Sequence, residues 1–113
     1  MSDCVPYAIH TATGIEYDIV LDAAKRFGWN THDGMTAVGG WCVLRDLGVS
    51  ASSMRRPGER TTLARFLSRL DSTRTYIIDV NEHWLSVRAG IVFDKAITHP
   101  RTVVRNYIEL PSR

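Results

Sequence analysis

Apolar residues recur with a helical period in the first two thirds of the chain. This pattern predicts a first helix over 4–13, a second over 16–27, a third over 36–47 and a fourth beginning at Thr61 or Thr62. Gly14, Gly28 and Gly48 follow the first three helices, as glycine often does at a helix end. The Gly39–Gly40 pair either weakens the middle of the third helix or lets another backbone approach closely. The apolar face of the fourth helix consists of Leu63, Phe66, Leu67 and Leu70.

The period then becomes extended, with short β-branched and aromatic runs separated by turn residues. The predicted strands are Thr75–Val80, His83–Arg88, Ile91–Asp94 and Val103–Leu110. Asn81–Glu82 and Ala89–Gly90 are short enough to form consecutive hairpins of an antiparallel meander. The fold class expected is therefore α+β, with N-terminal helices (about 4–70) packed on a C-terminal antiparallel sheet of about four strands (about 75–110). Residues 1–113 form a single domain in this prediction.

Composition excludes several classes of function. The 44% hydrophobic content supplies a core without disulfides, and the net charge of only +2 does not indicate a nucleic-acid partner. The one local basic cluster (Arg55, Arg56 and Arg60) is interrupted by other residues. No apolar run reaches the roughly 20 residues that span a bilayer, and no signal peptide precedes the first helix. The expected compartment is a reducing cytoplasm, with no membrane partner.

Cys4 is the most informative residue for chemistry. Pro6 fits only in a first helical turn, which places Cys4 at the helix N-terminus. The positive end of the helix dipole and the free backbone N–H groups stabilise a thiolate there, as a nucleophilic cysteine requires. The alternative interpretation is a buried, inert thiol, which is also the simplest role for Cys42 in the third helix.

A nucleophilic cysteine needs a base and a group that orients the base. Of the four histidines (His10, His32, His83 and His99), His83 opens a strand, where a helix N-terminus can meet the sheet. If Ala89–Gly90 is a two-residue turn, His83 and Asp94 are diagonal neighbours on one face of the sheet. A three-residue loop would move Asp94 to the opposite face, and the pattern alone does not choose between the two.

The order of these parts resembles that of papain-like cysteine peptidases, most closely the small C39-like members found in some phage and bacterial genomes. The resemblance covers about residues 3–110. The motifs that carry it are Asp3-Cys4, the Ala-Thr-Gly-Ile run at 12–15, and His83-x5-Ala89-Gly90-x3-Asp94. It implies that Cys4 is the nucleophile, His83 the general base and Asp94 the residue that orients it, with no cofactor and no metal. The implied partner is a protein or peptide substrate, or a host protein in the host cytoplasm if the chain is phage-encoded.

Two departures from that family keep other functions open. Papain-like enzymes place a Gln or Asn before the cysteine for the oxyanion hole, whereas Asp3 precedes Cys4 here and the sequence contains no glutamine. Ala89 stands where relatives often have Asp or Asn. One alternative is therefore a weak or inactive papain-like scaffold that binds a protein. Another is a peptidoglycan amidase of the NlpC/P60 or CHAP type, although the Gly-Asp-rich strand of those enzymes is missing. The Cys and His spacings do not match those of zinc sites.

Overall fold

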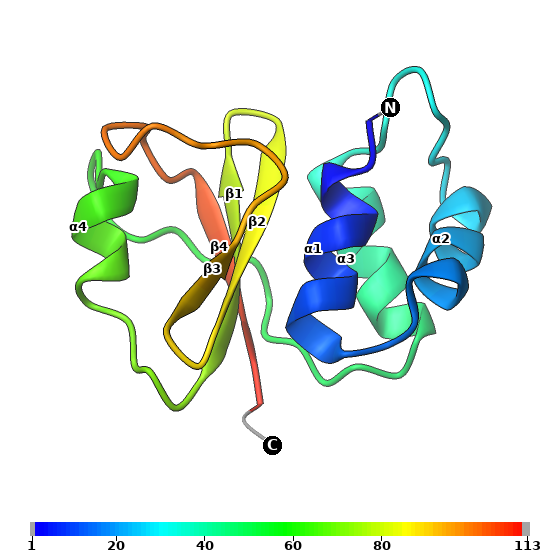
Figure 1. Ribbon diagram of the computed structural model, residues 1–113, viewed down its shortest axis with the longest axis horizontal. Coiled ribbons are helices and arrows are strands. Elements are labelled where there is room, and N and C mark those ends of the chain that lie inside the picture. The colour runs from blue at the N-terminus through cyan, green and yellow to red at the C-terminus, as the bar shows by residue number, and fades with distance from the viewer. Residues whose placement is uncertain (1, 112–113) are drawn as a thin grey trace.

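A four-stranded antiparallel sheet lies between helices on both of its sides in the computed structural model, which describes residues 2–111 (Figure 1). The helices α1–α3 lie on one side of the sheet and α4 lies on the other. In chain order the elements are α1 (Cys4–Thr13), α2 (Tyr17–Arg26), α3 (Ala37–Asp46), α4 (Leu63–Leu67), β1 (Thr75–Val80), β2 (His83–Arg88), β3 (Ile91–Phe93) and β4 (Asn106–Leu110). The predicted α+β class, with helices first and the sheet last, is confirmed.

The first helix begins and ends where the sequence predicts. Asp3 is its N-cap residue but makes no side-chain cap hydrogen bond, and Gly14 ends the helix at a φ of 78°. The second and third helices are one residue shorter at each end than predicted. The fourth is a single short segment, in which the Thr62 hydroxyl caps the helix by accepting the Arg65 N–H.

The sheet has the strand order β3-β2-β1-β4, so the three-strand meander is confirmed and β4 joins it beside β1. The Arg88–Ile91 pair closes the β2–β3 hairpin, which shows that Ala89–Gly90 is a two-residue turn. The third strand ends at Phe93, one residue earlier than predicted. The fourth begins later than predicted, because Val103 pairs with Thr62 as an isolated bridge before the chain enters the sheet.

Both faces of the sheet are buried. The core against α1–α3 includes Val5, Ile9, Val20, Leu44, Ile77, Trp84 and Ile108. The core beneath α4 includes Leu63, Phe66, Tyr76, Ile78, Val80, Leu85 and Val87. Strand β1 runs through the middle, which explains why its residues are nearly all buried instead of alternating.

A close contact at α3 accounts for one of the two adjacent glycines. A Cβ at Gly40 would lie 2.6 Å from Cη2 of Trp84 and 2.7 Å from Cγ1 of Val5. The group that approaches this helix is therefore an indole ring and not a second backbone. Gly40 thus lets α3 pack against the residue that follows Cys4 and the residue that follows His83.

Candidate active site

Cys4, His83 and Asp94 meet at one end of the molecule, where the N-terminus of α1, the β1–β2 turn and the β3–β4 loop come together (Figure 1). The Cys4 sulfur is half-buried at the start of α1. The His83 imidazole and the backbone N–H of Trp84 act on it as hydrogen-bond donors and lower the pKa of its thiol. Strand β3 ends opposite Ser86, so the first half of β2 has an open edge on that side. In the described part of the chain, no strand pairs with β2 beyond Ser86 on that side, so the Trp84 N–H is left to act on the thiol.

Asp94 fixes the other side of the imidazole. Its Oδ1 lies 2.5 Å from Nε2 of His83. The same carboxylate accepts the backbone N–H groups of Ala96 and Thr98, each at 3.1 Å, which hold it in one orientation. Because Nε2 is engaged by Asp94, Nδ1 is the ring nitrogen left to face the sulfur. Asp94 therefore orients the ring and stabilises its cationic form.

The charges at this site favour a thiolate–imidazolium pair. Burial raises the pKa of the Cys4 thiol, but hydrogen bonds from His83 and from the Trp84 and Val5 N–H groups outweigh burial and lower the pKa below the usual thiol value. The hydrogen bond to Cys4 is the largest influence on His83 and, together with Asp94, it raises the imidazole pKa to about 9 against the effect of burial. Burial raises the pKa of Asp94, but hydrogen bonds from Thr98 and His83 bring it below the usual carboxyl value. The imidazole is thus protonated and the carboxylate ionised at neutral pH.

An oxyanion formed beside Cys4 would find one free backbone donor. The first hydrogen bond of α1 runs from the Tyr7 N–H to the Asp3 carbonyl, and the Cys4 N–H has no partner among residues 2–111. That N–H is in the position expected for an oxyanion donor at a helix N-terminus. The cavity around the sulfur has no Asn or Gln among the described residues that line it.

Asp3 has two polar partners of its own beside the site. Its carboxylate accepts the Tyr17 hydroxyl at 2.7 Å and pairs with the Lys95 ammonium at 3.0 Å. Burial raises the pKa of Asp3, but these two partners bring it below the usual carboxyl value. Partial burial and the nearby Asp3 carboxylate raise the pKa of the Tyr17 hydroxyl to about 12. No motif in the sequence indicated a role for Lys95, although it directly follows Asp94 and carries the charge that Asp3 requires.

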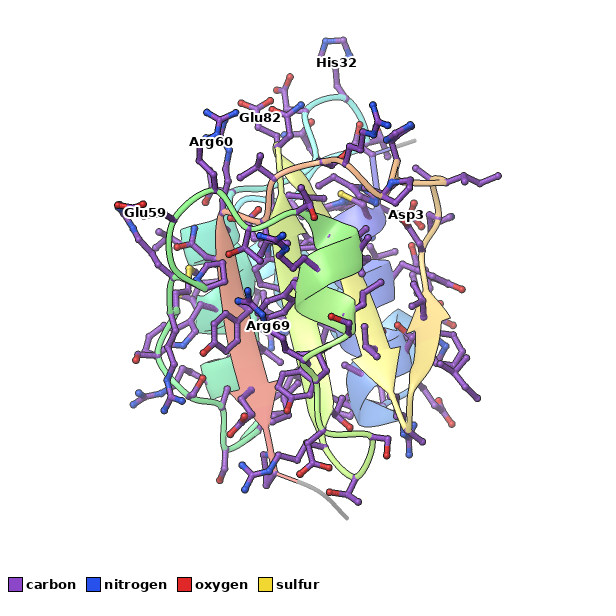
Figure 2. All side chains as sticks on the ribbon, turned by 90° about the vertical axis from the view of Figure 1, so that its left-hand side faces the viewer. Asp3, His32, Glu59, Arg60, Arg69 and Glu82 are labelled. Carbon is purple, nitrogen blue, oxygen red and sulfur yellow. The ribbon has the colours of Figure 1, made fainter. Side chains whose placement is uncertain are left out.

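A groove passes over the sulfur. A cavity of about 480 Å³ contains Cys4 and His83, and a second of about 620 Å³ shares four of its lining residues. The shared residues are Asp33, Gly34, Met35 and Glu82, from the α2–α3 loop and the β1–β2 turn. Figure 2 shows Glu82 and Asp3 at the same end of the molecule. Apolar side chains, including those of Val5, Phe27, Met35 and Trp84, line the larger cavity.

The other candidate residues do not join this site. His10 donates from Nδ1 to the Ile15 carbonyl at 2.6 Å, and His99 Nδ1 accepts the Arg101 N–H. The side chain of His32 is 93% exposed and projects into solvent in Figure 2. Cys42, predicted to be a core thiol, is only half-buried. Within residues 2–111, no group of His, Cys, Asp and Glu side chains is arranged to hold a metal ion, and no helix is both long and apolar enough to cross a membrane.

Comparisons with protein-family models, with curated proteins and with solved structures found no match to this chain.

Proposed function

We propose that this protein is a small papain-like cysteine hydrolase that cleaves a peptide or isopeptide bond by acyl transfer through Cys4. The observation that carries the proposal is the row of groups Cys4–His83–Asp94, in which one imidazole lies between a thiol at a helix N-terminus and a partly buried carboxylate. The carboxylate orients the imidazole and favours its protonated form, and the imidazole in turn favours the thiolate, as nucleophilic catalysis requires.

In the first half-reaction the Cys4 thiolate attacks the substrate carbonyl carbon, and the carbonyl oxygen becomes an oxyanion. The Cys4 N–H donates to that oxygen. The His83 imidazolium gives its Nδ1 proton to the leaving amine as the carbon–nitrogen bond breaks, which leaves a thioester on Cys4. Asp94 keeps Nε2 protonated, so the ring loses the proton that faces the substrate.

In the second half-reaction the neutral His83 takes a proton from water, and the resulting hydroxide attacks the thioester carbonyl. The carbon–sulfur bond breaks, the acid product leaves, and the thiolate–imidazolium pair is restored. Neither half-reaction needs a metal or an external cofactor, because the sulfur, the imidazole and water account for every proton transferred and every bond made or broken.

The groove favours an extended polypeptide as substrate. It is open, continues past Cys4 between the α2–α3 loop and the β1–β2 turn, and combines an apolar lining with the carboxylates of Asp33 and Glu82. A peptide segment can place apolar side chains along Val5 and Met35 while its scissile carbonyl lies over the sulfur.

Selective alkylation tests the nucleophile without knowledge of the substrate. Iodoacetamide is added to the whole chain near neutral pH, and the labelling of Cys4 and Cys42 is followed separately by mass spectrometry. Both thiols are half-buried, so Cys42 is a control matched for accessibility. Cys4 is expected to react at least tenfold faster, since the reactive form is the thiolate, and His83→Ala should abolish most of this advantage. Equal, slow labelling of both thiols would exclude an activated nucleophile.

A peptide-library digest analysed by mass spectrometry tests turnover, with Cys4→Ala as the control. One observation favours a second function, a papain-like scaffold that binds a protein without cleaving it. The cavity offers the Cys4 N–H but no side-chain amide as an oxyanion donor among the described residues, and the loss of one such donor costs about 100-fold or more in rate. Rapid alkylation of Cys4 with no cleavage of any library peptide would support that second function.

A further inference from the structure

We propose that Lys95 is a positioning residue of this site. Lys95 directly follows Asp94, and its ammonium pairs with Asp3, which directly precedes Cys4. The ammonium thereby links the two segments and cancels the negative charge that Asp3 places near the sulfur. This role depends on the acyl-transfer function proposed for Cys4, and it adds a residue that the Cys4–His83–Asp94 row does not include.

The contacts of Lys95 cross from the sheet to the helices. Its Nζ lies 3.0 Å from each carboxylate oxygen of Asp3 and 5.4 Å from the centre of the Tyr7 ring. Tyr17, on α2, donates its hydroxyl to Oδ2 of the same carboxylate. Asp3 directly precedes Cys4, and Lys95 directly follows Asp94. The ion pair therefore ties the N-terminus of α1 to the β3–β4 loop, and these two segments carry two of the three reacting or orienting groups.

The ion pair is asymmetric in its exposure. The Asp3 side chain is only 7% exposed, whereas that of Lys95 is 46% exposed. Without the ammonium, a nearly buried carboxylate would stand next to the Cys4 thiolate with only a hydroxyl as partner, and like charges that close disfavour ionisation. Lys95 is thus required to make an acidic residue compatible with a thiolate at the adjacent position.

Besides Cys4 itself, five charged or titratable groups of the described part of the chain line the cavity around the sulfur, each from a different element or loop. They are Asp3 at the start of α1, Asp33 in the α2–α3 loop, Glu82 in the β1–β2 turn, His83 on β2 and Lys95 in the β3–β4 loop. Among the described residues that line this cavity, Lys95 and the His83 imidazolium are the cations. Removing the Lys95 ammonium therefore leaves His83 as the one positive group that these residues offer to the thiolate.

The test measures the pH midpoint of Cys4 alkylation by iodoacetamide in the full chain, with Cys42 labelling as the internal reference. Lys95→Met is expected to raise the midpoint by roughly half a unit to one unit, as for the loss of a nearby favourable charge. Asp3→Asn removes the opposing charge and should move the midpoint the other way, and Lys95→Arg should leave it unchanged. In the double variant Asp3→Asn/Lys95→Met the midpoint should return to the wild-type value.

Hydrogen exchange of the loop tests the tie itself. The double variant Asp3→Asn/Lys95→Met removes both charges and with them the ion pair that joins α1 to the β3–β4 loop. The Ala96 and Thr98 amides that bond to Asp94 should therefore exchange severalfold faster than in the wild type. A Lys95→Met midpoint equal to that of the wild type, or unchanged exchange in the double variant, would overturn the role of Lys95 while leaving the nucleophile in place. A wild-type Cys4 that labels no faster than Cys42 would instead overturn the hydrolase itself, and the role of Lys95 with it.

Discussion

Gly40 is the point at which packing and chemistry are most closely joined, and Gly40→Ala tests that connection. The added methyl group would lie 2.6 Å from Cη2 and 2.9 Å from Cζ3 of Trp84, and 2.7 Å from Cγ1 of Val5. All three distances are far below van der Waals contact. The indole is 2% exposed and the valine 4% exposed, so neither can move into solvent.

The expected cost follows from two opposing effects. Overpacking a buried contact costs about 1–3 kcal/mol, and a clash with three atoms of two buried groups belongs at the upper end of that range. Replacing a mid-helix glycine by alanine stabilises the helix by about 1 kcal/mol. The net loss of unfolding free energy is therefore on the order of 2 kcal/mol, which in a chain of this length lowers the melting temperature by roughly 8 °C.

The same clash should reduce the reactivity of Cys4. Val5 follows Cys4 and Trp84 follows His83, so pushing these two apart lengthens the sulfur–imidazole hydrogen bond that stabilises the thiolate. Alkylation of Cys4 at pH 7 should fall severalfold, while that of Cys42 stays unchanged.

Gly39→Ala is the matched control, because its methyl group would meet the flexible end of Met35 at 3.0 Å, with Thr36 Oγ1 at 3.2 Å and the Phe27 carbonyl at 3.3 Å. We expect its stability to lie within about 1 kcal/mol of the wild type. Thermal denaturation and alkylation rates measure both effects. The reasoning is refuted if Gly40→Ala melts no lower than the wild type and keeps its Cys4 reactivity, or if Gly39→Ala costs as much.

Three further predictions concern the charges and contacts around the site. The rate of hydrolysis should fall as pH rises through about 9, because the imidazole, whose pKa is raised to about 9, then loses the proton that it gives to the leaving amine. A pH–rate profile with an alkaline limit near the ordinary histidine pKa would contradict this. Asp94→Asn removes one of the two groups that raise the pKa of His83, so the alkaline limit should move to lower pH, and an unmoved limit would show that Asp94 does not act on the imidazole. Thr11→Val breaks the 2.7 Å hydrogen bond to the buried Ser86 hydroxyl near the C-terminal end of α1. It should cost about 1–2 kcal/mol in denaturant unfolding without changing Cys4 alkylation.

The turn between β2 and β3 shows how far the sequence could predict the site. The strands and the two possible registers were readable from the pattern, but the choice between them was not. Ala89 adopts a φ of 52° and Gly90 a φ of 77°, the left-handed pair of a two-residue hairpin. Alanine is not a residue that indicates such a turn. The register is stabilised by tertiary contacts, because only this pairing lets Asp94 meet both His83 and the amides of its own loop.

The surroundings of Cys4 show a second limit of the sequence. Proline in the first turn was enough to predict the helix N-terminus and the thiol upon it. Asp3 alone suggested a charge that would repel an oxyanion. Its actual partners, Tyr17 and Lys95, lie 14 and 92 positions away, and no local rule connects a carboxylate to a hydroxyl or an ammonium at such separations. The one signal in the sequence was the pair of opposite charges on Asp3, which precedes Cys4, and Lys95, which follows Asp94.

Positioning and reactivity are divided between adjacent residues at this site. Cys4 and His83 are half-buried, and each is followed by a fully packed neighbour, Val5 or Trp84. The packed neighbours should therefore control both stability and reactivity, and the reacting groups chiefly reactivity. Val5→Ala is expected to cost roughly 1–3 kcal/mol and also to slow Cys4 alkylation, whereas Cys4→Ser should leave the melting temperature within a few degrees of the wild type. Val5→Ala with unchanged alkylation would show that the helix holds the sulfur in place without this packing, and the contact at Gly40 would then have no part in the chemistry.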